Sequence, residues 1–218
     1  MSTAEYESSA DYEGDVTVLE EQFTEQKSVG PIELESQDVS VWFGRRKVLE
    51  GVNIACPKNT VTALIGPSGY GKSTYIRTLN RLHELIPGAA LAGSVLYEGK
   101  DIYDTDIDPV HIRLQIGMVF QYPVIYRGTT VARNLELPLI AAKMNSSARK
   151  KRIDEMAEII GLTDVLETNV DRLDNAGRQK VAVAREVARQ PEVLLFDEPI
   201  TNVDLTSKLE LKRSLKQL

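Results

Sequence analysis

The sequence predicts an α/β fold in which a mostly parallel sheet is covered on both faces by helices. Three short apolar runs, Val61–Ile65, Ile116–Phe120 and Val193–Phe196, have the length and continuous hydrophobicity of buried parallel strands. Helical segments lie between them, and strands that alternate with helices form a sheet of this kind. A glycine-rich turn joins the first run to a helical segment, which is a further mark of the class.

Two other regions carry strand and turn signals. Apolar and β-branched residues gather around Leu34 and again before Tyr97, and each cluster is followed by a turn that contains glycine. The predicted elements are Ile32 and Leu34, the strand Val39–Phe43, the turn Gly44-Arg45-Arg46 before Val48, the strand Ser94–Tyr97 and the turn Glu98-Gly99.

Four helices are predicted, at Lys72 to about Leu82, Ser146–Ile160, Ala176–Arg189 and Thr206–Leu218. The second is the most regular, because its apolar residues share one face and Gly161 provides a stop. Pro191 ends the third.

The charge of the chain is concentrated at its N-terminus. Residues 1–30 hold eight acidic residues and one basic residue, a balance of −7, whereas residues 31–218 hold 25 basic and 24 acidic residues. The first segment is too polar to bury a core, so it is predicted to be an acidic disordered tail. The near-neutral remainder carries no basic field, which argues against nucleic acid as a partner.

Neither a membrane span nor a signal peptide is predicted. The longest apolar stretches, such as Leu137–Ala142, are far shorter than the ~20 residues that a spanning helix needs. The N-terminus lacks the basic start and apolar core of a signal peptide. The chain is therefore expected in the cytoplasm, where it reaches a membrane only through a partner. Cys56 is the only cysteine, so no intrachain disulfide is expected, and a core or strand-end position suits it.

The segment Gly66–Ser73, GPSGYGKS, fits the phosphate-binding pattern G-x-x-x-x-G-K-[ST]. Its glycines let the loop curl with amide N–H groups pointing at phosphate oxygens, and the following helix adds its positive N-terminal end. Lys72 supplies a mobile cation for the β- and γ-phosphates, and Ser73 offers its hydroxyl to Mg²⁺. An ordinary glycine-rich turn is the alternative, and the strand before the motif and the helix after it disfavour that alternative.

Two adjacent acids, Asp197 and Glu198, end the last apolar run. Alone, such a pair is most often a charged strand end. Together with a phosphate loop, it predicts that Asp197 holds Mg²⁺ through its water shell and that Glu198 polarises the attacking water as general base. Both are needed, because a carboxylate neutralised by the metal cannot also accept a proton. Gln121 follows the run Ile116–Phe120 and is either surface decoration or a group that reaches Mg²⁺ and the attacking water.

In this order and spacing, the motifs resemble those of the ABC transporter ATPase family over nearly all of residues 32–218. Gly66–Ser73 resembles its Walker A motif, Gln121 its Q-loop, Leu194–Glu198 its Walker B motif and Asn202–Asp204 its D-loop.

The resemblance implies a P-loop NTPase fold that binds ATP and Mg²⁺. Its mostly parallel core sheet would carry an antiparallel β subdomain at the N-terminus. An α-helical subdomain would occupy about residues 122–180 of an ATP-binding domain that spans residues 31–218.

The resemblance also assigns roles to individual residues. Lys72, Gln121 and Glu198 would be catalytic, and Ser73, Gln121 and Asp197 would hold the metal. Phe43, with Trp42 beside it, resembles the aromatic that stacks on adenine, and its alternative is a buried strand aromatic. The other implied nucleotide contacts are Gly66, Pro67, Ser68, Gly69, Gly71, Lys72, Ser73, Thr74, Asp174, Asn175 and Gly177.

Within the family, the two halves of the chain resemble different branches. Ile76–Leu82, Leu85–Ala89 and Ile102–Asp104 look like phosphate-importer ATPases, whereas Phe120–Tyr126 and Phe196–Asp204 look more like importers of sugars, glycerol or other polyols. Import of inorganic phosphate is therefore the first functional prediction, and import of another solute is the alternative.

Two features depart from the family pattern. The signature, usually Leu-Ser-Gly-Gly-Gln, falls on Leu173–Gly177, where Asp174 replaces the hydroxyl that faces the γ-phosphate bound by the other subunit. As a structural alternative, Asp174 is a plain helix N-cap. Neither His83, predicted on a helix surface, nor His111, predicted in a short helix, lies where the family has its switch histidine, and both are predicted to be structural. The sequence is therefore expected to be either truncated before that residue or a member without the switch. The ATPase would then be impaired, or the chain a regulatory pseudo-ATPase. The adjacent acids disfavour a third rival, a small-molecule kinase.

The resemblance finally implies an assembly. Two ATPase domains would pair head to tail, as a homodimer or heterodimer, at the cytoplasmic face of the cell membrane. Transmembrane permease subunits and an extracytoplasmic solute-binding protein would complete the import system, with no nucleic acid.

Overall fold

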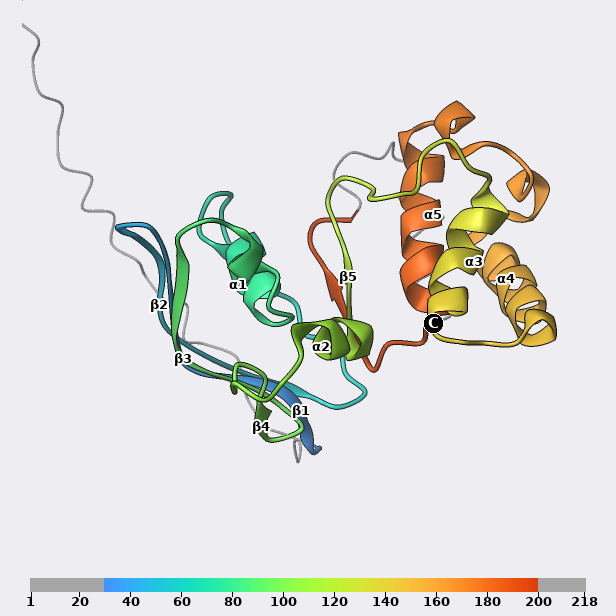
Figure 1. Cartoon of the computed structure of the whole chain (residues 1–218). Helices are drawn as coiled ribbons and strands as arrows, with labels where there is room; N and C mark the ends of the chain where they lie inside the picture. Colours follow the sequence, from blue (N-terminus) through green and yellow to red (C-terminus); the bar gives the residue numbers. More distant parts are fainter. Residues whose placement is uncertain (1–29, 200–218) are drawn as a thin grey trace, which may run out of the picture. The chain divides into compact units, whose positions relative to one another are not determined.

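The structure is a computed structural model that describes residues 30–199 of the 218-residue chain (Figure 1). The predicted acidic tail lies outside these residues except for Gly30, and so does the predicted helix Thr206–Leu218.

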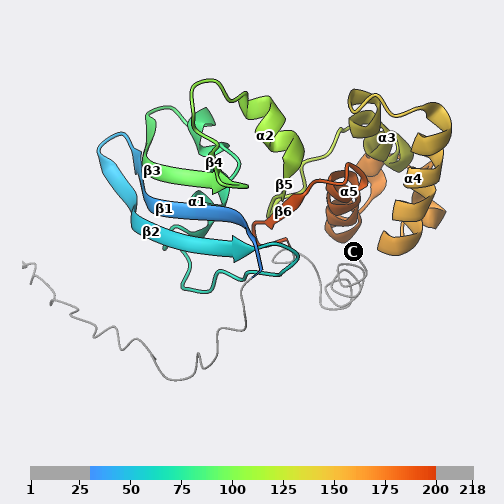
Figure 2. The same ribbon diagram turned by 90° about the horizontal axis from the view of Figure 1, so that it is seen from below.

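A four-stranded antiparallel sheet occupies the first half of the described chain (Figure 2). Its strands are β1 (Ile32–Phe43), β2 (Arg46–Pro57), β3 (Ala89–Tyr97) and β4 (Lys100–Asp101), in the order β2-β1-β3-β4. The predicted turn between β3 and β4 is confirmed. Both of its residues have a positive φ, 49° at Glu98 and 77° at Gly99, which matches the twist of a tight hairpin.

A parallel pair of strands carries Gln121 and the acids Asp197 and Glu198 at its ends. β5 (Ile116–Val119) pairs with β6 (Val193–Phe196), with Ile116 opposite Val193 and Val119 opposite Phe196. The Asp197 amide donates to the Val119 carbonyl at 2.9 Å, so the pairing continues one residue past β6. Because the strands are parallel, the residues that follow them emerge at the same edge. Both strands were predicted from their apolar runs.

The third apolar run, Val61–Ile65, was wrongly predicted as a buried strand. Val61 is 98% exposed and Ile65 is 94% exposed, and no part of the run is in a strand. A strand needs a neighbouring strand to satisfy its backbone groups. Within residues 30–199, β6 pairs only with β5, and the run has no partner. The parallel sheet is therefore limited to two strands in this part of the chain.

Three long helices, α3 (Val131–Ala141), α4 (Ser146–Ile160) and α5 (Asn175–Ala188), pack around a common core. The bounds of α4 match the prediction, and Gly161 ends it with a φ of 72°. The core includes Leu135, Leu139, Met156, Ile160 and Val183.

Shorter helices complete the described chain. α1 (Lys72–Thr78) follows the phosphate-loop sequence, and α2 (Pro109–Gln115) contains His111, as predicted. The remaining 3-10 turns are η1 (His83–Leu85), η2 (Thr163–Val165) and η3 (Val170–Arg172). A second core joins the antiparallel sheet to α1, α2 and the parallel pair through Val41, Tyr75, Ile112, Met118 and Leu195.

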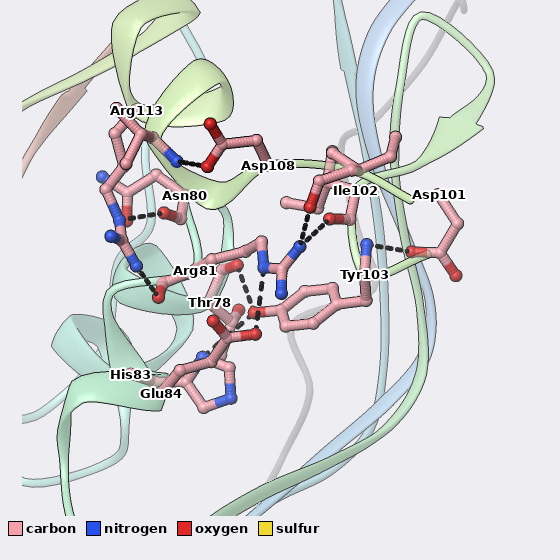
Figure 3. A network of polar contacts seen from close by, with 12 residues as sticks. Thr78, Asn80, Arg81, His83, Glu84, Asp101, Ile102, Tyr103, Asp108 and Arg113 are labelled. Atoms are coloured by element: carbon pink, nitrogen blue, oxygen red, sulfur yellow. Dashed lines mark hydrogen bonds and ion pairs between the residues drawn. The ribbon is translucent and has the colours of Figure 1, made fainter. Parts of the chain in front are cut away.

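α1 is shorter than predicted, because the backbone at Arg81, inside the predicted helix, has a φ of 61° and leaves the helical conformation. Side chains from later segments bind carbonyl groups at and just past the end of α1 (Figure 3). The Tyr103 hydroxyl donates to the Thr78 carbonyl at 2.8 Å. The Arg113 guanidinium donates to the carbonyls of Asn80 and Arg81 at 3.3 and 2.7 Å. These contacts satisfy carbonyl groups at the end of the helix that have no other side-chain donor among the described residues.

His83 is buried, so its prediction as a helix surface residue was wrong. It is 2% exposed in the turn η1, with Nδ1 3.0 Å from the Tyr103 hydroxyl oxygen. That hydroxyl has one hydrogen and donates it to the Thr78 carbonyl, so Nδ1 of His83 must be the donor in this pair. The partner that buries His83 lies 20 residues away along the chain, outside any local pattern.

Within residues 30–199, no helix combines the length and the apolar character that crossing a membrane requires.

Candidate functional site

The glycine-rich segment forms an open loop before α1. Gly66, Pro67, Ser68 and Gly69 are exposed, and Gly69 has a φ of 84°. Gly71 has a φ of 87°, and a Cβ there would lie 2.6 Å from Cδ2 of Leu49. The positive φ would strain any other residue here, and a Cβ would also displace the end of the Leu49 side chain, which explains the second glycine of the motif.

The Lys72 ammonium group lies against the backbone of this loop. Its Nζ donates to the carbonyls of Gly66 and Pro67 at 2.8 and 2.7 Å. The positive charge is therefore held against two carbonyl groups of the loop. Thr74 is half-buried in the first turn of α1.

The phosphate-loop sequence and the acidic end of β6 come into contact through Ser73 and Asp197. The Ser73 hydroxyl donates to Oδ1 of Asp197 at 2.6 Å, although the residues are 124 positions apart. Arg77 donates to Oδ2 of the same carboxylate at 3.3 Å. The Asp197 side chain is 4% exposed, so α1 supplies the polar partners that this buried carboxylate requires.

Gln121 and Glu198 meet at the same edge, because they follow β5 and β6. Nε2 of Gln121 donates to Oε2 of Glu198 at 3.2 Å. Glu198 is exposed, and its backbone has a φ of 47°, a region that non-glycine residues seldom adopt. Such a conformation costs about 1 kcal/mol or more and is concentrated at functional sites.

The oxygen atoms of these side chains are suitable ligands for a small, hard divalent cation. Mg²⁺ is bound in proteins by carboxylate and hydroxyl oxygens together with phosphate oxygens of a substrate. The oxygens of Ser73 and Asp197 are already in contact, and the amide oxygen of Gln121 belongs to the same edge. Ser73 and Asp197 would hold the ion, with Gln121 beside them.

A cavity of about 840 Å³ adjoins this group of residues. It is bounded on one side by residues 57–64 and on the other by β6, and Lys72, Asp197 and Glu198 form part of its wall. The cavity therefore separates the unpaired run Val61–Ile65 from β6.

The predicted signature segment begins α5, and Asp174 is the N-cap of that helix. Its Oδ1 accepts a hydrogen bond from the Gly177 amide at 2.7 Å, as in the structural alternative. Asn175 is the first residue of the helix, and both it and Asp174 are exposed. The hydrogen bond of the Asp174 side chain thus lies within the first turn of α5.

Phe43 lies at the end of β1 and packs against the second core, half-buried. Trp42 is covered instead by Lys47, whose Nζ lies 5.3 Å from the ring centroid. Phe43 is therefore partly a core aromatic, and its half-exposed position leaves part of the ring accessible.

Three polar residues at the site were not identified from the sequence. Arg77 contacts Asp197, and its position four residues after Ser73 on a helix is the signal that could have revealed it. Gln179 of α5 donates to the Phe120 carbonyl at 3.0 Å, next to Gln121. Asn134 of α3 binds both backbone groups of Tyr126. The last two contacts join distant segments, so no local pattern marks them.

Comparison with known protein families gives one matching model. It describes the ABC transporter family and matches residues 49–201.

Curated relatives include two phosphate import ATP-binding proteins named PstB. That of Mycolicibacterium smegmatis is 41% identical over 187 residues, which cover 82% of this chain and 71% of the relative. That of Bifidobacterium longum is 40% identical over 188 residues, with the same coverage.

Solved structures give the same fold. The cbiO1 protein of Clostridium perfringens, part of the ABC transporter complex cbiONQ, superposes with a TM-score of 0.74 at 24% identity, over 86% of this chain and 73% of that chain. The ATP-binding cassette MJ0796, in a dimeric state bound to ADP and Pi, superposes with a TM-score of 0.72 at 26% identity, over 85% of this chain and 82% of that chain.

Proposed function

The chain belongs to the ABC transporter family of ATP-binding proteins, and from that membership we propose that it hydrolyses ATP to drive import of inorganic phosphate. The observation that carries the ATPase part is the 2.6 Å contact between Ser73 and Asp197. It joins the phosphate-loop sequence to the acidic strand end.

In the proposed reaction, water attacks the γ-phosphorus of ATP, the bond to ADP breaks, and phosphate leaves. Mg²⁺, when bound, neutralises charge on the phosphate oxygens. The loop amides and Lys72 bind and orient the phosphates. Glu198 accepts a proton from the attacking water, and the Gln121 amide holds its carboxylate in place. Asp197 and Ser73 keep their oxygens together for the metal.

The proposed assembly follows the family, whose ATPase subunits dimerise and work with permease subunits. Asp174 and Gly177 at the start of α5 would face the nucleotide of a second subunit. The Asp174 carboxylate accepts from the Gly177 amide and places a negative charge where the family has a neutral hydroxyl. We expect this charge to lower the affinity of the paired site for the γ-phosphate, so turnover should be slower than for a serine in that position.

Phosphate is supported as the cargo by the similarity to the two PstB proteins. Segments near α1 and β4 that resemble phosphate importers also form the buried polar contacts of Figure 3. The identity of about 40% leaves another solute as the second candidate, supported by the different resemblance of Phe120–Tyr126.

Release of phosphate from ATP tests the enzymatic proposal. The chain should release phosphate in a Mg²⁺-dependent reaction, with and without permease subunits. Glu198→Gln should bind ATP but lose at least about a hundredfold in turnover. Glu192→Gln, an exposed acid that precedes β6, is the matched control and should retain turnover. Nucleotide binding without turnover in every preparation would instead indicate a regulatory pseudo-ATPase.

Uptake into vesicles tests the cargo. The chain should be reconstituted with permease and solute-binding proteins from the same organism, with radiolabelled phosphate and labelled glycerol phosphate or maltose in parallel. ATP-dependent accumulation of phosphate alone supports the proposal. Accumulation of a sugar or polyol compound without phosphate would assign the chain to the second candidate.

A further inference from the structure

Arg77 contacts the same carboxylate that would hold the metal. It lies four residues after Ser73 on α1, so the two side chains leave the same face of the helix one turn apart. Ser73 occupies Oδ1 of Asp197 and Arg77 occupies Oδ2, at 2.6 and 3.3 Å. Both oxygens of the carboxylate are therefore engaged by α1.

The contacts of Arg77 differ from those of the structural arginines nearby. Arg81 donates to the carbonyls of Ile102 and Ile107 and pairs with Glu84 one turn on, and Arg113 donates to two further carbonyls (Figure 3). Among the described residues, Arg77 has an ion pair to Asp197, and its buried Nε has no acceptor. Its guanidinium is thus directed at the site rather than at the backbone.

We infer that the positive charge of Arg77 lowers the affinity of Ser73 and Asp197 for a divalent cation as long as no nucleotide is bound. The inference rests on the proposed function in taking this pair as the metal site. Two cations that share one carboxylate repel each other, and the 4% exposure of the Asp197 side chain limits the screening at that end, although the Arg77 side chain is 39% exposed. The negative triphosphate offsets this repulsion, so the metal binds together with the nucleotide. Arg77 acts through Asp197 and is therefore a positioning residue, not a catalytic one.

Mn²⁺ binding to the nucleotide-free chain tests the inference, with free Mn²⁺ measured by electron paramagnetic resonance. Arg77→Met removes the charge and keeps an apolar stem, and it should bind Mn²⁺ about tenfold more tightly than the wild type. Arg77→Lys keeps the charge and should stay within about twofold of the wild type. Arg133→Met is the matched control, because Arg133 is a similarly exposed helical arginine paired with Glu136, and it should change nothing.

A double variant tests whether the tighter Mn²⁺ binding of Arg77→Met depends on the Asp197 carboxylate. Arg77→Met combined with Asp197→Asn should lose the tighter Mn²⁺ binding of Arg77→Met alone. Saturating ATP analogue should reduce the difference between wild type and Arg77→Met to less than about threefold. If Arg77→Met is not folded by circular dichroism, Arg77→Gln replaces it with the same expected result.

Equal or weaker Mn²⁺ binding by the neutral variants would overturn the inference, as would the same gain in Arg133→Met. These outcomes are distinct from failure of the proposed function. Absence of phosphate release by the wild type would reject the ATPase, whereas the comparison of Mn²⁺ affinities uses protein without nucleotide and stays valid.

Discussion

Single residues at the site are held by partners from other elements. Gln179 is an example, because it is 1% exposed and joins α5 to the backbone carbonyl of Phe120. Its Oε1 is buried without a hydrogen-bond partner among the described residues. A buried amide with one unsatisfied atom lowers stability, which favours a positioning role beside Gln121 over a stabilising one.

Replacement of Gln179 by Met should affect turnover more than stability. The change removes the unsatisfied Oε1 but leaves the Phe120 carbonyl without its donor, so the free energy of unfolding should change by less than about 1 kcal/mol. Turnover should fall about tenfold, since Gln121 loses its support. Phosphate release and urea unfolding measure the two effects, with the exposed Gln37→Met as control. A large loss of stability with unchanged turnover would contradict this role.

His83 should make stability depend on pH. Burial lowers the pKa of His83 below its usual value near 6.5, the Glu84 charge opposes the shift, and the Arg81 charge adds to it. The unfolded chain then binds a proton more readily than the folded one. The stabilising contribution is complete above pH 6.5 and is lost as pH falls through the lowered pKa, with a slope of at most about 1.4 kcal/mol per pH unit.

Chemical denaturation between pH 5 and 8 measures this dependence. His83→Gln keeps an amide donor for the Tyr103 hydroxyl but cannot titrate, so its stability should vary less over the same range. Burial also raises the pKa of Tyr103 far above its usual range, so that side chain contributes no titration here. An unchanged slope in His83→Gln would assign the pH dependence to other groups.

At the scale of elements, α3 and α5 fix the segment after Gln121. Asn134 is fully buried and binds the amide and carbonyl of Tyr126, the Thr129 hydroxyl and the Thr130 carbonyl. The Arg185 guanidinium stacks over the Tyr126 ring at 5.3 Å. The segment is therefore fixed to α3 and α5.

Asn134→Ala should lower the free energy of unfolding by about 2 to 3 kcal/mol, because several buried polar groups lose their partner together. Asn145→Ala is the contrasting variant. Asn145 is an exposed N-cap with a side-chain hydrogen bond to the Ala148 amide, and its loss should lower stability by about 1 kcal/mol. Urea unfolding of both variants compares them, and a larger effect at Asn145 would show that the loop contacts are weak.

At the scale of the whole molecule, two hydrophobic cores meet along the parallel strands. Val119 belongs to the core of the three long helices, whereas Met118 belongs to the core of the antiparallel sheet. The proposed nucleotide site lies at the carboxyl edge of these same strands. Binding at that edge should therefore stabilise the folded chain as a unit.

ATP with Mg²⁺ at about 100 times its dissociation constant should raise stability by about 2.7 kcal/mol, or roughly 5 to 10 °C in Tm. Lys72→Ala should abolish this increase while leaving the ligand-free Tm nearly unchanged, since Lys72 binds only exposed loop carbonyls among the described residues. Lys150→Ala, an exposed lysine of α4, should retain the full increase. Thermal melting with and without ligand measures these differences, and a full increase in Lys72→Ala would remove that residue from the site.

The sequence alone determined the helix and strand bounds and the motifs that depend on residues close together in the chain. The bounds of α4 and β6 follow from apolar periodicity, a helix-stopping glycine and a short apolar run. The pattern Gly66–Ser73 and the acids after β6 identified the family, because their chemistry depends on residue types at fixed spacing.

Only the tertiary structure decided which distant groups touch. It buried His83 beneath Tyr103, left Val61–Ile65 without a neighbouring strand, and brought Arg77 and Gln179 to the site. Each of these outcomes depends on a partner far away in the chain. A local sequence pattern records the preference of a segment, but not the neighbour that satisfies or overrides it.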